Sequence, residues 1–85
     1  MTVIPDHLKD YWDEAKGSVK EKTPDAAIEA LAGQIKLKRD AEKRISEEGA
    51  IVMDAKGNAV EHPGIKIARE AGREVQGWIN RYGST

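Results

Sequence analysis

The stretch Glu47–Tyr82 constrains the fold more than any other, because it holds local signals for a helix end, a chain reversal and a helix start. Gly49 is typical of the left-handed position just beyond the end of a helix. In segment 54–58, the leading Asp can bond its own backbone and Gly57 can take positive φ at no steric cost, which favours a tight reversal. Pro63 favours the first turn of a new helix and keeps the preceding residue extended. The sequence therefore predicts a helix, a short hairpin and another helix in this order.

The predicted hairpin pairs two short β-prone runs, residues 50–53 and 59–61. A two-stranded ribbon is only marginally stable in water, so it must pack against the helices. We expect Ile51, Met53 and Val60 to be the apolar side chains that anchor it.

An apolar stripe at helical spacing marks the helix that begins at Pro63 and stops at Gly83. The stripe comprises Ile65, Ala68, Ala71 or Gly72, Val75, Trp78 or Ile79, and Tyr82. We expect it to pack on both the preceding helix and the ribbon, as the structural centre of the domain. Taking the whole chain, the residues assigned to core or subunit-interface packing are Trp12, Ile35, Ile65, Val75, Trp78, Ile79 and Tyr82.

Two further helices precede this stretch. Pro5 and Asp6 suit a first helical turn. The apolar stripe that follows is Ile4, Leu8, Trp12, Ala15 and Val19, and we expect the helix to end between Gly17 and Lys22. Thr23 offers a capping hydroxyl ahead of Pro24, which predicts a second helix from about Pro24 to Glu48. Its apolar positions are Ala27, Ile28, Leu31, Ala32, Ile35, Ala41 and Ile45.

The fold class is therefore mainly α, with three helices and a short β-hairpin between the second and third. At 85 residues we expect a single small domain spanning residues 1–85. A domain of this size buries only about 60–65% of the surface that its unfolded chain exposes. Apolar residues make up 39% of the chain and charged residues 34%, so we expect a thin core and helices with long solvated faces or subunit contacts.

Several classes of protein are disfavoured. The chain has no cysteine, which removes disulfides, thiolate metal sites and cysteine nucleophiles. No apolar run approaches the roughly 20 residues of a membrane span, and the N-terminus lacks the features of a signal peptide. We therefore expect a soluble intracellular protein with no membrane association.

Candidate catalytic residues are scarce. The carboxylates alternate with basic residues on solvated faces, and no metal-binding motif occurs, so we expect no enzyme activity, no cofactor and no metal. The two histidines are far apart in the sequence. His7 falls in the first turn of the first helix, whereas His62 stands at the junction of ribbon and helix, where we expect it to cap the helix or bond a ribbon carbonyl.

Positive charge is unevenly distributed although the net charge is −1. Five basic residues lie within 36–44, against two acids, and the third helix adds Lys66, Arg69, Arg73 and Arg81 against Glu70 and Glu74. Two interpretations remain open: a basic face, or a solvated surface in which the charges pair at i, i+4 spacing. The residues alone favour the paired surface.

Three motifs occur in a consistent order along nearly the whole chain. Ile4-Pro5-Asp6-His7-Leu8 is followed by Trp12, a long helix closes with Glu48-Gly49, and Gly49-Ala50-Ile51-Val52 leads through Gly57 to His62-Pro63-Gly64-Ile65-Lys66-Ile67-Ala68-Arg69. These three motifs resemble those of phage terminase small subunits. The family's motifs, in the same order, are P-x-x-L…W, a helix ending in E-G, and G-x-I-V…G…H-P-x-x-K-I-x-R. The chain resembles a short version of this family without its usual terminal extensions.

The resemblance implies a non-catalytic adaptor in the host-cell cytoplasm. Such small subunits assemble into rings, bind double-stranded viral DNA and regulate a large subunit that holds the ATPase and nuclease. The basic residues of the second and third helices would then face DNA: Lys36, Lys38, Arg39, Lys43, Arg44, Lys66, Arg69 and Arg73. The alternative is a protein-interaction or regulatory module of a phage or mobile element that binds no DNA of its own.

Overall fold

Three helices and one hairpin make up the computed structural model, which describes residues 4–83. A 3-10 turn, η1 (Asp6–Leu8), leads into α1 (Lys9–Gly17), and α2 (Asp25–Glu48) follows. The strands β1 (Ile51–Met53) and β2 (Ala59–Glu61) form the antiparallel hairpin that precedes α3 (Pro63–Tyr82). The fold class predicted from the sequence is confirmed.

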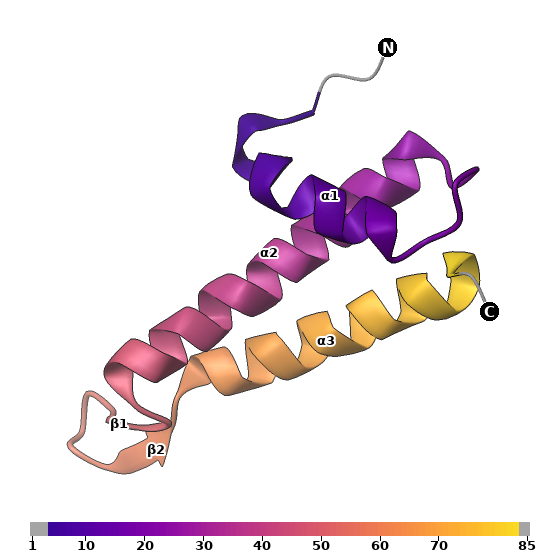
Figure 1. The fold of residues 1–85 in the computed structure, drawn as a ribbon. Helices are drawn as coiled ribbons and strands as arrows, with labels where there is room; N and C mark the ends of the chain where they lie inside the picture. Colours follow the sequence, from indigo (N-terminus) through magenta and orange to yellow (C-terminus); the bar gives the residue numbers. More distant parts are fainter. Residues whose placement is uncertain (1–3, 84–85) are drawn as a thin grey trace.

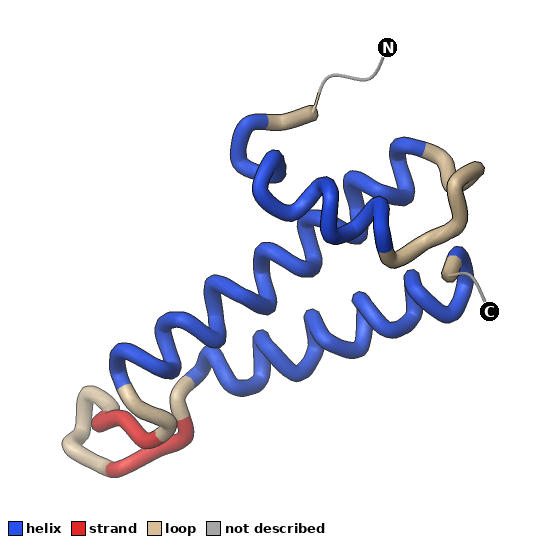
Figure 2. Tube along the Cα trace, viewed as in Figure 1, coloured by secondary structure: helices blue, strands red, loops and turns tan. Residues whose placement is uncertain are grey.

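The two long helices run antiparallel, with the β-hairpin at one end and α1 across the other (Figure 1). Figure 2 shows the strands confined to the tip where the chain passes from α2 to α3. The Cα radius of gyration is 15.4 Å, against about 12 Å for a compact domain of this length. The molecule is therefore elongated, and its two ends have different surroundings.

The core lies at the end where α1 crosses α2 (Figure 1). Its buried members are Leu8, Trp12, Ala15, Val19, Ile28, Leu31, Ala32 and Ile35. Half-buried side chains near the C-terminal end of α3 pack against this cluster, and the backbone N–H of Lys20 donates to the carbonyl of Tyr82 at 2.8 Å. The core is thus centred on α1 and α2. The predicted packing of α3 on α2 is confirmed, but the prediction that the α3 stripe is the structural centre is wrong, because within that stripe only Ala71 is buried.

The predicted anchors of the hairpin are wrong. Ile51 is 64% exposed, Met53 67% and Val60 37%. The register pairs Val52 with Val60, and side chains alternate along a strand, so Ile51 and Met53 lie on the face opposite Val52. Val52 is the half-buried residue of β1. The apolar pattern of the run 50–53 does not reveal which of its two faces meets the helices.

The turn has the chemistry that the sequence predicts. The Asp54 carboxylate accepts hydrogen bonds from the backbone N–H groups of Lys56 and Asn58, each at 2.9 Å. These bonds, the one from Asn58 foremost, lower the pKa of Asp54 below its usual value. Gly57 has φ of +83°, a conformation that residues with a Cβ rarely adopt.

The start of α2 differs from the prediction in one respect. Pro24 stands at the N-cap and the helix begins at Asp25, so Thr23 lies one position too early for its hydroxyl to reach the first free N–H groups. The Thr23 side chain is buried, and its oxygen has no hydrogen-bond partner among the described residues. The predicted cap by Thr23 is therefore wrong.

Candidate functional site

The five basic residues of α2 are all engaged with carboxylates. Four pairs lie within α2: Lys36–Asp40, Lys38–Glu42 at 3.3 Å, Lys43–Glu47 at 3.9 Å and Arg44–Glu48 at 3.0 Å. The fifth joins two helices, since Arg39 binds Glu14 of α1. Hydrogen bonds to their partners raise the pKa of Lys36 and of Arg44. The spacing predicts these four i, i+4 pairs, and they form; it also predicts a pair of Asp40 with Arg44, which does not form.

The basic residues of α3 are less occupied. Lys66 lies 4.0 Å from Glu70, at the limit of an ion pair, while Arg69 and Arg73 make no ion pair with any residue in the range 4–83. All three are exposed, and their spacing of three and four places them on one helical face. Beyond them, the amides of Gln76 and Asn80 bond each other at 2.9 Å. We call this surface, made of Lys66, Arg69, Arg73, Gln76 and Asn80, the α3 polar face.

Close approach to the α3 polar face is sterically open. A Cβ added at Gly77 would meet no atom within 4 Å. The guanidinium of Arg81 lies 5.7 Å from the ring centroid of Tyr82, and Arg81 lines a hollow together with Arg73 and Gly77. The structure thus separates the eight predicted DNA-binding residues into five paired ones on α2 and three on α3, two of them without ion pairs.

The residues predicted for packing lie in several environments. Trp12 and Ile35 are buried in the core, and the half-buried Val75, Trp78 and Tyr82 pack against it. The rings of Trp78 and Tyr82 stack, with centroids 5.6 Å apart and planes 17° from parallel. Ile65 and Ile79 are half-buried.

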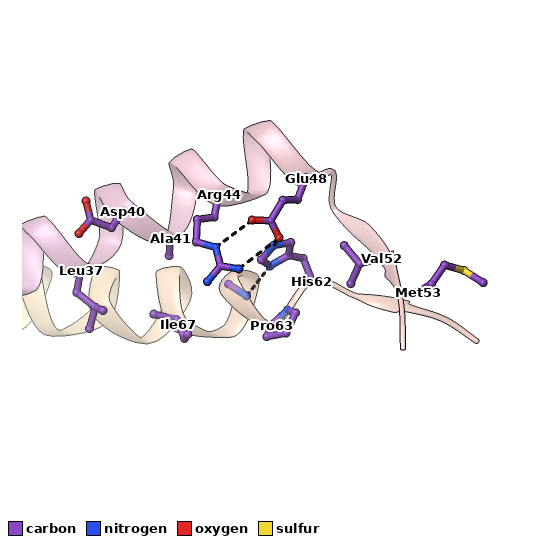
Figure 3. Close-up of a pocket in the computed structure, with 11 residues that line it drawn as sticks. Leu37, Asp40, Ala41, Arg44, Glu48, Val52, Met53, His62, Pro63 and Ile67 are labelled. Atoms are coloured by element: carbon purple, nitrogen blue, oxygen red, sulfur yellow. Dashed lines mark hydrogen bonds and ion pairs between the residues drawn. The ribbon is translucent and has the colours of Figure 1, made fainter. Parts of the chain in front are cut away.

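A buried histidine joins the ends of α2 and α3 (Figure 3). The backbone N–H of Gly64 donates to Nδ1 of His62 at 2.8 Å, so His62 caps α3 as the sequence predicts. Nδ1 therefore carries no proton, and Nε2 donates to the Glu48 carboxylate at 3.0 Å. Glu48 also accepts from Arg44, and these two bonds lower its pKa, with Arg44 the larger cause. The link to Glu48 was not predicted, because the two residues stand 14 positions apart.

A largely apolar hollow lies beside this junction, between α2 and α3. It has a volume of about 500 Å³, and its apolar lining includes Leu37, Val52 and Ile67, with Arg44 and Glu48 among its polar residues (Figure 3). A second hollow of about 590 Å³ shares Leu37 and Ile67 and extends to Gln34 and Glu74. Arg73 of the α3 polar face also lines this hollow. We call the two together the furrow.

Sequence reasoning missed the two side chains at the middle of the furrow. Leu37 is 45% exposed and Ile67 41%. Both residues fall outside the apolar stripes predicted for their helices. An apolar residue outside such a stripe is expected to lie on the surface, and this signal could have identified them.

Within residues 4–83 no three carboxylate or imidazole side chains gather as a metal site would require. Likewise, no helix in that range is long and apolar enough to cross a membrane. Two exposed features of the described chain stand out: the α3 polar face and the furrow.

A family model described as phage terminase, small subunit, matches residues 12–85, which include α2, the hairpin and α3. The chain belongs to the phage terminase small-subunit family. No match was found among curated proteins or among solved structures. Terminase small subunits are non-catalytic components of DNA packaging, so the chain has a role in phage packaging and is not an enzyme.

Proposed function

We propose that this terminase small subunit binds double-stranded viral DNA as a ring-like homo-oligomer and regulates the large subunit, in the cytoplasm of the host cell. The observation that supports DNA binding is the α3 polar face, where Arg69 and Arg73 are exposed and make no ion pair with any described residue. Guanidinium groups in this state are available to contact phosphate oxygens.

The basic residues of α2 are less suited to this role. To bind DNA, each of these cations would have to leave its carboxylate partner and contact a phosphate. The free energy lost with the ion pair would offset part of the attraction to DNA. Exposed pairs contribute only about 0–1 kcal/mol each, so this difference ranks the two surfaces and does not exclude α2. The α3 polar face needs no such exchange at Arg69 or Arg73.

One copy of the chain has too little positive charge to hold DNA tightly, because its net charge is −1. Phosphate contacts dominate affinity for DNA, and their number sets the salt dependence. An oligomer that presents several α3 polar faces to one duplex would multiply those contacts and gain avidity. DNA binding and self-association are therefore proposed together.

The direct test compares Arg69→Gln/Arg73→Gln with Lys36→Gln/Lys43→Gln, in duplex-binding titrations at several salt concentrations. The α3 variant should bind more weakly and lose about 0.9 in the log–log salt slope for each phosphate contact removed. The α2 variant removes the same charge from paired positions and should change affinity less. Equal losses in both variants would contradict the assignment of the DNA contacts to α3.

Regulation of the large subunit is measured separately. The ATPase rate of the large subunit should change when the small subunit is added, with and without DNA. An unchanged rate in both cases would contradict this part of the proposal.

The alternative is an interaction module without DNA binding. The observation that favours it is the pairing of all five α2 cations, which leaves little free positive charge. It predicts no measurable duplex binding by the assembled protein even at low salt.

A further inference from the structure

We infer that the β-hairpin of one copy of this chain seats in the furrow of the next copy, forming a head-to-tail interface. This inference deepens the proposed homo-oligomer and rests on it. It specifies the surfaces that meet and the symmetry that results.

The two surfaces lie at the same end of the molecule and have different shapes. The furrow is a hollow between α2 and α3 with the half-exposed Leu37 and Ile67 at its middle. The hairpin projects beyond the helices (Figure 1), and Ile51 and Met53 are the most exposed of the chain's large hydrophobic side chains within residues 4–83. We call Ile51 and Met53 the knob. Both surfaces leave apolar side chains in water.

A chain cannot fill its own furrow with its own knob. The hairpin is tied at both ends, by the end of α2 at Gly49 and by His62, whose backbone N–H donates to Ala50 and whose ring caps α3. Strand alternation keeps Ile51 and Met53 on the face opposite Val52. Met53 lines the hairpin end of the furrow together with Val52, and its side chain extends away from the two helices (Figure 3). It therefore cannot cover Leu37 and Ile67 at the middle of the furrow.

Size and charge favour a second copy as the occupant. The furrow follows α2 from Gln34 to Glu48, which is about 21 Å of helix. Each arm of the hairpin has four residues, Ile51 to Asp54 and Asn58 to Glu61, and reaches about 14 Å when extended. Lys56 at the tip makes no ion pair in the described structure, and the far end of the furrow is lined by two carboxylates, Glu70 and Glu74, and one cation, Arg73. A hairpin laid along the furrow brings Lys56 toward this net negative charge.

The pairing of a knob with a hollow elsewhere on the same chain determines the symmetry. Such a contact is heterologous, so each copy uses one surface for the preceding subunit and the other for the following one. Closed rings form when the rotation between copies returns to the start. A furrow-to-furrow contact would instead produce closed dimers and would not need the hairpin.

The test uses Ile51→Glu to disable the knob and Leu37→Glu to disable the furrow. Both residues are exposed, so helical circular dichroism should be retained, and Ser46→Glu on α2 is the matched control. Wild type and the control should assemble, whereas each variant alone should associate at least about tenfold more weakly. Because both changes add acid, the two damaged surfaces cannot pair with each other by charge.

Mixing the two variants decides the symmetry. Ile51→Glu keeps an intact furrow and Leu37→Glu keeps an intact knob, so an equimolar mixture should form a species of two subunits and nothing larger, by light scattering or mass photometry. Assembly of either variant like wild type, or a mixture that stays monomeric, would overturn the head-to-tail interface. A monomeric wild type would overturn both this inference and the proposed oligomer, whereas a wild type that assembles alongside variants that assemble equally well would overturn this inference alone.

Discussion

The two ends of the α2–α3 pair differ in how they are stabilised, although the same two helices run through both. Where α1 crosses, Leu31 is 1% exposed and sits in a continuous apolar cluster. At the β-hairpin end, Leu37 on the same helix is 45% exposed. There the helices meet at the small buried residues Ala41 and Gly64, beside the hydrogen bond from His62 to Glu48. A third packed element produces a core, and without one the same helices leave a furrow.

This difference separates stability from binding. Two helices alone bury only the stripe along their contact, so apolar side chains beside that stripe remain in water unless another element covers them. α1 provides that cover at one end. At the other end the ribbon is too small to do so, which leaves Leu37 and Ile67 for a partner.

The same substitution at Leu31 and Leu37 should have very different costs. Leu31→Ala removes a fully buried side chain and should lower the free energy of unfolding by about 3–4 kcal/mol. Leu37→Ala changes an exposed position and should cost at most about 0.5 kcal/mol. Urea unfolding at low protein concentration, where assembly contributes least, measures both. Similar losses would mean that the furrow end is packed as tightly as the core.

Removal of the junction histidine should have the next largest effect. His62→Ala deletes a buried ring and the cap of α3, and should lower the free energy of unfolding by about 2 kcal/mol. His62→Asn keeps a short acceptor that suits an N-cap and should restore about half of that loss. Chemical unfolding of the three proteins gives the comparison. If Asn recovers nothing, the cap is not what stabilises the junction.

Two glycines of α3 should respond in opposite directions. A Cβ at Gly64 would lie 3.0 Å from Nδ1 of His62 and 3.3 Å from the carbonyl oxygen of Ala41, so Gly64→Ala should cost about 1 kcal/mol. Gly77 has no atom within 4 Å of the same position, and Gly77→Ala should stabilise the helix by up to about 1 kcal/mol. Shifts in thermal midpoint measure both. A gain at Gly64 would show that the helices can separate there at little cost.

Local signals made much of the fold predictable. Gly49, Pro63 and the turn at Asp54 each act through their own backbone or their nearest neighbours, so their positions follow from the sequence. The cap by His62 is local in the same sense. Thr23 was mispredicted because a shift of one residue in the start of α2 removes its hydroxyl from reach.

Features that depend on distant residues could not be predicted. Which face of the hairpin meets the helices depends on the register of the ribbon against α2 and α3, and both faces of the run 50–53 are apolar. The pairing of Arg39 depends on where α1 places Glu14, 25 residues away. The furrow exists because α1 covers only one end of the helical pair, which no periodicity within α2 or α3 reveals.

The smallest expected effect is a dependence of the junction on acid pH. Arg44 and His62 lower the pKa of Glu48 in the folded protein, so its ionised form stabilises the fold above the usual carboxyl pKa of about 4.5, and that contribution is lost as the pH falls through the lowered value. Wild type should therefore be more stable than Glu48→Gln at neutral pH, and the difference should shrink below about pH 4.5. Glu47→Gln is the matched control, because Glu47 contacts Lys43 and not His62. Unfolding midpoints of the three proteins across this range measure the effect, and a difference between wild type and Glu48→Gln that stays constant with pH would show that the ionised Glu48 does not stabilise the junction.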